Sequence, residues 1–212
     1  MSKHYSKAWR AIMAVGRKKI FDEDVALKAA MDVFWEKGYI GASLSELTQK
    51  MGINKPSLYS TFGNKEALFV KATQLYCANK IECLSDLLKS TDLSLKQRIK
   101  TYMMSIVAVQ CESQKAKGCY VVHCQTEVTS GDIPAEASQL LNDAGSYVQA
   151  LLEDVLKNDQ EAQRLGLDKG AKVKAFCLAA TLRGSATMAR CGHDMSELEP
   201  VIEHSLKGIG LE

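Results

Sequence analysis

A short stretch between Asn54 and Gly63 combines one lysine, one tyrosine and several small hydroxyl side chains. Asn54 is a good helix cap, and the proline two residues later is tolerated in a first helical turn. In the helix that this pattern predicts, Leu58 and Phe62 share one face, which must be buried. The other faces offer a cation and hydroxyl groups, which contact DNA phosphates and base edges in many proteins. The segment therefore indicates recognition of a nucleic acid.

The seven cysteines are the second set of residues with chemical potential. They lie at positions 77, 83, 111, 119, 124, 177 and 191, without the spacing of a disulfide framework. We expect reduced thiols in a cytoplasmic protein. Cys119 and His123 share a helix face, which suits a metal or a reactive thiol, but no CxxC motif or second histidine at ligand spacing accompanies them. We predict no metal site, and a sensor role for Cys119 or Cys124 stays open beside simple packing.

Several other classes of protein are disfavoured by the sequence. The motifs G-x-S-x-G and H-E-x-x-H and a phosphate-cradling glycine loop do not occur, so neither an enzyme nor a cofactor is expected. No apolar stretch approaches the ~20 residues of a membrane span. The basic start is not followed by the apolar run of a secretory signal.

The net charge of +2 is unevenly distributed along the chain. Residues 1–70 carry a net charge of +4, and the remainder carries −2. Six lysines and arginines, and no acidic residue, lie within residues 1–19. A basic segment on a nearly neutral protein suits a polyanionic partner, with a solvated tail as the alternative.

The elements that must position these residues are all predicted to be helices. Asp22 is expected to cap a first helix that ends at Gly38, and Ser43 with Glu46 forms a possible capping box for a second, which stops at Gly52. A helix is expected after residue 64, then longer ones over Leu95–Ser113, Cys119–Thr129, Ile133–Lys157, Lys169–Arg190 and Ser196–Lys207, with the polar stretch Asn158–Asp168 as a connection. The fold class is therefore all-α, with an N-terminal three-helix domain and a larger C-terminal helical domain.

Two of the short helices, with the turn between them, form the pattern LSELTQKMGINKPSLYSTF, a helix-turn-helix. In that motif the second helix enters the DNA major groove and the first contacts the backbone. An αα-hairpin that only packs within a bundle is the alternative. The stretch FDEDVALKAAMDVFWEKGYIGASLSELTQKMGINKPSLYSTFGNKEALFVKA, about Phe21–Ala72, closely resembles the DNA-binding domain of TetR-family transcriptional regulators. The preceding GRKK resembles the basic arm of many members.

The resemblance implies an all-α homodimer that binds a palindromic operator and is usually released by a small molecule. It implies a basic arm or extension at 1–20, a helix-turn-helix domain at 21–66, and an effector-binding and dimerisation domain at 67–212. Members commonly start near Met13, so residues 1–12 are either an extension or a misassigned start. The expected DNA-binding residues are Arg17, Lys18, Lys19, Ser43, Ser45, Lys55, Pro56, Ser57, Leu58, Tyr59, Ser60 and Lys65, although periodicity equally places Leu58 in the core.

The last two helices are predicted to form the dimer interface. Small residues surround the helix at Ala175–Ala189, and the following helix carries an apolar stripe. Two such helices from each of two chains form a four-helix interface, with the internal core of a monomer as the alternative. The predicted interface residues are Ala179, Ala180, Gly184, Leu198, Val201 and Ile202.

An effector pocket is expected among the central helices, because methionine and cysteine side chains there adapt to irregular ligands. The predicted lining is Met103, Met104, Val107, Gln110, Tyr120, Cys124, Tyr147, Leu151, Phe176 and Cys177. Such a lining favours a hydrophobic or aromatic effector. Oxidation or alkylation of Cys119 or Cys124 is the competing trigger.

Overall fold

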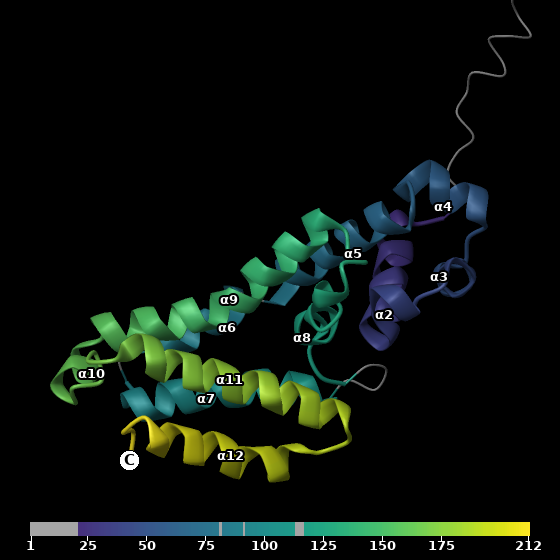
Figure 1. Ribbon diagram of the computed structural model, residues 1–212. Helices are drawn as coiled ribbons and strands as arrows, with labels where there is room; N and C mark the ends of the chain where they lie inside the picture. The colour runs from purple at the N-terminus through teal and green to yellow at the C-terminus, as the bar shows by residue number, and fades with distance from the viewer. Residues whose placement is uncertain (1–20, 81, 91, 113–116) are drawn as a thin grey trace, which may run out of the picture.

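The computed structural model describes residues 21–80, 82–90, 92–112 and 117–212, and every regular element in this part is helical (Figure 1). The predicted all-α fold class is confirmed. The basic arm, with Arg17, Lys18 and Lys19, lies outside the described residues. None of the described helices combines the length and the apolar character needed to cross a membrane. The elements are α2 (Glu23–Gly41), α3 (Leu44–Met51), α4 (Lys55–Phe62), α5 (Lys65–Lys80), α6 (Glu82–Ser85), η1 (Asp86–Lys89), α7 (Leu95–Glu112), α8 (Tyr120–Gln125), η2 (Val128–Ser130), α9 (Ala135–Asn158), α10 (Gln160–Arg164), α11 (Ala171–Arg190) and α12 (Met195–Gly208).

The first helices begin at the residues that local chemistry predicts. The predicted end at Gly38 appears as a break within α2, where the backbone angles are non-helical, and α2 continues to Gly41. The Asp22 carboxylate accepts backbone N–H groups of the first turn of α2, and Ser43 and Glu46 form the reciprocal capping box of α3. The Asn54 side chain caps α4 through a 2.8 Å bond from the Ser57 N–H. Gly52, with a φ of 66°, ends α3 in the left-handed conformation that glycine adopts without strain. Gly52 and Asn54 thus form a tight turn between the end of α3 and the start of α4.

The apolar core is divided between two clusters. The first cluster contains side chains of α2, α3, α4, α5 and α8 and of the beginning of α9, where Leu141 is fully buried. The second is formed by α7, the end of α9, α11 and α12, and includes the fully buried Leu152. The two cores therefore divide within α9, so that α8 packs on the helix-turn-helix region although it follows α7 in sequence. The predicted domain boundary after residue 66 stays a prediction.

The later elements differ from expectation in two places. The helix predicted over Cys119–Thr129 is shorter, because α8 ends at Gln125 and a 3₁₀ turn follows. The stretch predicted as a polar connection contains α10, which Asp159 caps through the Glu161 N–H at 2.8 Å. Arg98 on α7 is almost buried, and its Nη1 lies 2.8 Å from Asp159 Oδ2. This ion pair holds the start of α10 against α7. A tertiary ion pair thus stabilises a helix too short to show a periodic pattern in the sequence.

Candidate nucleic-acid interface and effector cavity

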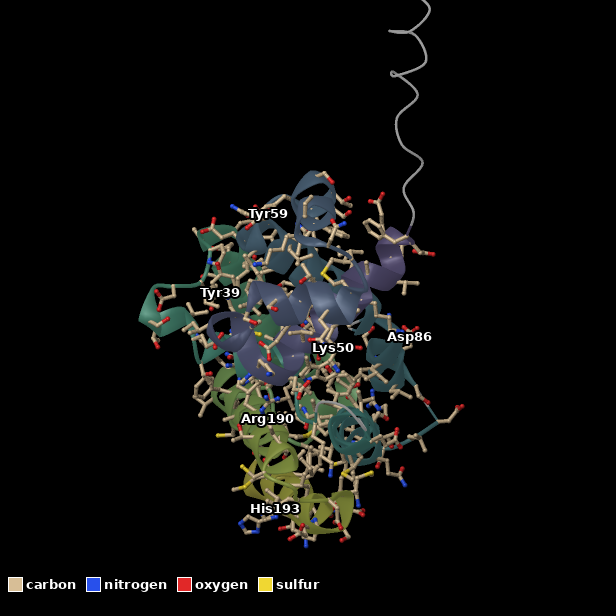
Figure 2. All side chains as sticks on the ribbon, turned by 90° about the vertical axis from the view of Figure 1, so that its right-hand side faces the viewer. Tyr39, Lys50, Tyr59, Asp86, Arg190 and His193 are labelled. Atoms are coloured by element: carbon tan, nitrogen blue, oxygen red, sulfur yellow. The ribbon has the colours of Figure 1, made fainter. Side chains whose placement is uncertain are left out.

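The short helix α4 has one buried face and a broad exposed one. Leu58 and Phe62 lie in the core, with exposed fractions of 0% and 4%. Tyr59 is 50% exposed, and Lys55 and Ser60 are also exposed. Figure 2 shows Tyr59 at the end of the molecule opposite to His193. The exposed face therefore offers a cation, a phenol and a hydroxyl group to a partner, while the buried face fixes the helix.

The other predicted DNA-binding residues of this region are placed as follows. Ser45 and Pro56 are exposed and Ser57 is half-buried. Ser43 is exposed, but its hydroxyl group takes part in the capping box of α3. Leu58 is a correction to the set, because its position on the anchoring face of α4 removes its side chain from any partner.

Lys65 is held at the start of α5. Its Nζ lies 4.4 Å from the centroid of the Tyr39 ring, a cation–π contact. Burial lowers the pKa of Lys65, and the nearby Glu127 carboxylate acts in the opposite direction. The Asn64 side chain accepts the Ala67 N–H at 2.8 Å and so caps the same turn. Lys65 is thus a fixed positive charge beside a helix N-terminus, which favours contact with a phosphate.

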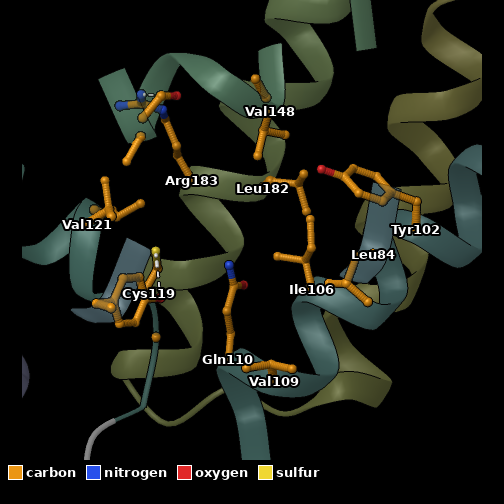
Figure 3. Close-up of a pocket in the computed structure, with 16 residues that line it drawn as sticks. Leu84, Tyr102, Ile106, Val109, Gln110, Cys119, Val121, Val148, Leu182 and Arg183 are labelled. Atoms are coloured by element: carbon orange, nitrogen blue, oxygen red, sulfur yellow. Dashed lines mark hydrogen bonds between the residues drawn. The ribbon is translucent and has the colours of Figure 1, made fainter. Parts of the chain in front are cut away.

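A cavity of about 320 Å³ lies among the helices that follow the helix-turn-helix region (Figure 3). Its wall is largely aliphatic and aromatic, so it suits an apolar ligand. Its size is near the lower end of the ~300–1,000 Å³ range of ligand pockets. The lining residues are Tyr76, Leu84, Tyr102, Ile106, Val109, Gln110, Gly118, Cys119, Val121, Val122, Ala144, Gly145, Val148, Ala179, Leu182 and Arg183.

Polar groups enter the cavity at three points. Gln110 is only 5% exposed, and its Oε1 has no hydrogen-bond partner among the described residues. Figure 3 shows its amide directed into the space between Cys119 and Ile106. Cys119 Sγ lies 3.6 Å from the Tyr76 hydroxyl oxygen. Arg183 donates to the side-chain oxygen of Gln125 and to a backbone carbonyl on α9, at 3.0 and 2.9 Å. The free amide oxygen of Gln110 is the group available to orient a ligand.

Only Gln110 of the predicted pocket residues lines this cavity. Met103, Val107, Tyr120 and Cys124 are completely buried in the two cores, Met104, Tyr147 and Leu151 are half-buried outside the lining, and Phe176 and Cys177 are exposed on α11. On α7 the cavity is lined by Tyr102 and Ile106, each one residue before the predicted Met103 and Val107, which face the core. Both pairs have helical spacing, so periodicity alone does not distinguish them.

The two candidate sensor thiols differ strongly in their surroundings. Cys124 is fully buried, and burial raises the pKa of its thiol far above the usual value. Cys119 is partly exposed and lines the cavity. Because the thiolate is the reactive form, the structure disfavours Cys124 as a sensor. No group of three metal-binding side chains comes together within the described ranges.

The outer face of α11 is unusually apolar for an exposed surface. Val173, Phe176 and Met188 are 67%, 59% and 49% exposed, and Ala180 and Gly184 lie exposed between them. On α12, Val201 is 49% exposed. The remaining predicted interface residues are buried within the chain itself. Leu198 and Ile202 belong to the stripe by which α12 packs on α7 and α11, and Ala179, on α11, lines the cavity. The three exposed predicted residues are therefore the ones available to a second chain.

Comparison with known proteins identifies the family. Residues 26–72 match the family described as "Bacterial regulatory proteins, tetR family". The HTH-type transcriptional repressor ComR of Escherichia coli (strain K12) is 32% identical over 194 residues, which cover 91% of this chain and 90% of ComR. The chain belongs to the TetR family. It is a transcriptional regulator of the helix-turn-helix class, and not an enzyme.

Two further transcriptional regulators extend the comparison. The HTH-type transcriptional repressor NemR of Escherichia coli (strain K12) is 27% identical over 169 residues, covering 80% of this chain and 84% of NemR. The structure of a cysteine mutant of the TetR family transcriptional regulator CifR, complexed with 26-base-pair double-strand operator DNA, is similar with a TM-score of 0.77. CifR is 29% identical, and the match covers 91% of this chain and 98% of that one. The similarity therefore includes the C-terminal helices as well as the TetR helix-turn-helix.

Proposed function

We propose that this TetR-family protein is a repressor that binds a pseudo-palindromic operator as a homodimer and releases it when a small apolar effector occupies the cavity. The observation that carries the proposal is α4, whose exposed face bears Lys55, Tyr59 and Ser60 while Leu58 fixes its position in the core. This is the arrangement that a recognition helix needs to enter a major groove. The same function is supported by ComR and NemR, which are transcriptional repressors, and by CifR, which forms a complex with operator DNA.

Selection from randomised duplex DNA is the direct test. The parent protein should enrich a sequence with two inverted half-sites, since a dimer with two-fold symmetry reads a palindrome. The half-site centres should lie about one turn, ~34–36 Å, or a multiple of it, apart. Failure to enrich any sequence would favour the alternative in which the hairpin only packs within a helical bundle or scaffold.

The proposed dimer uses the exposed face of α11 and α12. Ala180 and Gly184 permit the close approach of a second helix, and Phe176 and Met188 provide apolar contacts on either side. An exposed apolar face of this extent is typical of an interaction surface. Because a palindrome requires two copies of α4, this face supports the operator proposal as well.

The cavity favours an effector with an apolar body and one hydrogen-bond donor. Aliphatic and aromatic side chains form most of the wall, and the unpartnered Gln110 oxygen accepts a hydroxyl or amide N–H group. Tyr76, on α5, lines the cavity, and α5 begins beside the recognition helix at Lys65. A shift of α5 is thus the proposed route from ligand to DNA. The ligand must bind the DNA-incompetent state more tightly, since equal affinity for both states causes no release.

Filling the cavity should separate DNA binding from effector response. We expect Ile106→Trp to place a larger ring in the cavity and obstruct ligand binding there. It should leave operator affinity within about threefold of the parent, because Ile106 lies on α7, away from α4. The parent should bind the neutral fluorescent probe N-phenyl-1-naphthylamine, and compounds that displace the probe should release the operator. Ile106→Trp should neither bind the probe nor release the operator in response to these compounds. The conservative Ile106→Leu variant should bind the probe and release the operator as the parent does. Release that survives in Ile106→Trp would contradict an effector site in this cavity.

A second candidate is a thiol-responsive repressor of the same fold. The observation in its favour is the position of Cys119 in the cavity wall, beside the Tyr76 hydroxyl group. Addition of an electrophile or oxidation at Cys119 would enlarge this side chain within the cavity and disturb the packing beneath α5.

The two triggers are distinguished by matched cysteine variants. The operator complex is titrated with hydrogen peroxide and N-ethylmaleimide, using the parent, Cys119→Ser and Cys124→Ser. The reversible-effector account predicts no site-specific response to either reagent, and release by apolar compounds in all three proteins. A response that Cys119→Ser abolishes and Cys124→Ser retains would instead establish the thiol mechanism, since Cys119 is partly exposed whereas Cys124 is buried.

A further inference from the structure

The helix α2 is interrupted at Gly38, and this interruption lies against the α8–η2 segment. Gly38 has φ and ψ values of 75° and −178°, outside the helical region. A side chain at this position would meet Glu127, because a Cβ atom would lie 2.3 Å from the Glu127 Oε1. Only glycine therefore combines the left-handed φ with this close approach. The helix-turn-helix follows directly after the interruption.

Glu127 binds the backbone on the C-terminal side of the interruption. Its Oε2 accepts the Tyr39 N–H at 2.6 Å. In a regular helix that N–H would donate to the carbonyl of Trp35, four residues earlier. Glu127 also lies near Lys65, whose pKa it acts to raise. One carboxylate thus contacts the chain leading into α3 and the start of α5.

Arg190, the last residue of α11, binds the backbone on the N-terminal side. Its Nη1 donates to the Trp35 carbonyl at 3.1 Å, and its Nη2 donates to the Glu36 carbonyl. Carbonyl groups at the end of a helical segment lack intrahelical partners and carry partial negative charge, so a guanidinium group is well suited to them. The donor and the acceptor that a continuous helix would pair at Tyr39 and Trp35 are therefore both contacted by side chains from outside the helix-turn-helix. We call Glu127 and Arg190 the Gly38 clamp.

The Gly38 clamp is continuous with the cavity wall. Arg190 Nη1 also donates to the Lys117 carbonyl at 3.4 Å, and its Nη2 lies 3.3 Å from Nε2 of His123. The next two residues after Lys117, Gly118 and Cys119, line the cavity. Trp35 in turn packs edge-on against Tyr76, with ring centroids 5.3 Å apart. Arg190, the segment 117–119 and Trp35 thus connect the cavity wall, α11 and the end of α2.

We infer that Glu127 and Arg190 are positioning residues for operator recognition: they fix the angle at which α11 carries the helix-turn-helix and thereby set the half-site spacing that the dimer accepts. The inference rests on the proposed operator binding and dimerisation through α11. Arg190 stands at the end of the proposed dimer helix, so a rigid link from α11 to α2 transmits the dimer geometry to α4. Neither side chain needs to touch DNA for this role.

The spacing preference follows from DNA geometry. Inserting one base pair between half-sites moves the second by about 3.4 Å and rotates it by about 35° about the DNA axis. A dimer with rigidly held recognition helices tolerates neither change. A dimer whose helix-turn-helix domains can move relative to α11 accommodates both changes, but binds the best spacing with lower affinity. Loss of the clamp should therefore broaden the spacing profile rather than abolish contact with each half-site.

The test measures operator binding by full-length variants over a set of duplexes. The half-sites selected by the parent are held constant and their separation is varied by up to two base pairs in each direction. The variants are Arg190→Gln and Glu127→Ala, with Arg190→Lys and Glu127→Gln as conservative changes. Arg164→Gln on α10, exposed and at the opposite end of the molecule, is the matched control for loss of one positive charge. Thermal melting and sedimentation establish folding and dimer formation for each protein.

The parent and Arg164→Gln should prefer one spacing by about tenfold or more over its neighbours. Arg190→Gln and Glu127→Ala should reduce that preference to about threefold or less, with similar affinity for an isolated half-site. Glu127→Gln retains an acceptor for the Tyr39 N–H, and Arg190→Lys retains one donor, so both should lie between these limits. An unchanged spacing profile in the folded Arg190→Gln and Glu127→Ala proteins would overturn the inference. A parent without any enriched sequence would refute the proposed function, and the inference with it.

Discussion

Operator binding should be lost almost completely when Tyr59 and Lys55 are both replaced by alanine. Both side chains are exposed on α4, so their removal leaves the core residues Leu58 and Phe62 intact. Each lost contact to a base or phosphate costs about 1–3 kcal/mol, so the double variant should bind the selected operator about 100-fold or more weakly. The dependence of affinity on salt should also become shallower, because Lys55 would no longer displace a counterion.

Fluorescence anisotropy with a labelled operator measures both effects. Lys169→Ala is the matched control, because Lys169 is exposed in the turn before α11, away from α4. This control should bind with the affinity and salt dependence of the parent. Equal operator affinity in the parent and in the Tyr59→Ala/Lys55→Ala variant, with both proteins folded, would refute α4 as the recognition helix.

The second large effect is expected at the dimer face. In the proposed dimer, Ala180→Glu buries a charge from each chain at the closest approach of two α11 helices. Burial of unpaired charge costs about 3 kcal/mol or more, so the dissociation constant should rise by more than about 100-fold. Ala180 is exposed in the single chain, so the monomer should remain folded. Operator affinity should fall with dimerisation, because the two half-sites would then be bound independently.

Sedimentation velocity and thermal melting separate dissociation from unfolding. Ala150→Glu places the same side chain on an exposed position of α9, and it should leave the dimer unchanged. Ile202→Glu should behave differently from both, because Ile202 is completely buried within the chain and its replacement should unfold the monomer. A dimer of parental stability in Ala180→Glu would exclude the proposed interface.

The N-terminal helices could be predicted in detail because their signals are local. The cap residues Asp22, Ser43 and Asn54, and the stop at Gly52, act within three or four residues of their own position. Their hydrogen bonds are therefore visible in the spacing of residue types. The same is true of the recognition helix, whose alternation of Leu58 and Tyr59 between core and surface follows from helical geometry.

The C-terminal cavity and dimer face could not be predicted correctly, because the sequence does not specify which apolar stripe of each helix faces the core. On α7, α11 and α12 several apolar stripes have equivalent spacing, and each suits a core, a cavity or a second chain. Phe176 was predicted in the pocket but lies outside on α11, and Ile202 was predicted at the interface but lies inside. Which stripe meets which neighbour depends on the crossing of distant helices, and no local pattern encodes it.

The sequence alone determined that this chain is an all-α regulator with a helix-turn-helix, because capping, helical periodicity and the motif are properties of neighbouring residues. Only the tertiary structure decided the lining of the cavity, the free face of α11 and the contacts at Gly38. Glu127 and Arg190 lie 89 and 152 residues after Gly38, and their partners are a backbone N–H, which every residue except proline possesses, and backbone carbonyl groups, which all residues possess. A side chain that binds a backbone carbonyl or N–H imposes no residue type on its partner. Such a contact leaves no pattern in a single sequence and appears only when the chain has folded.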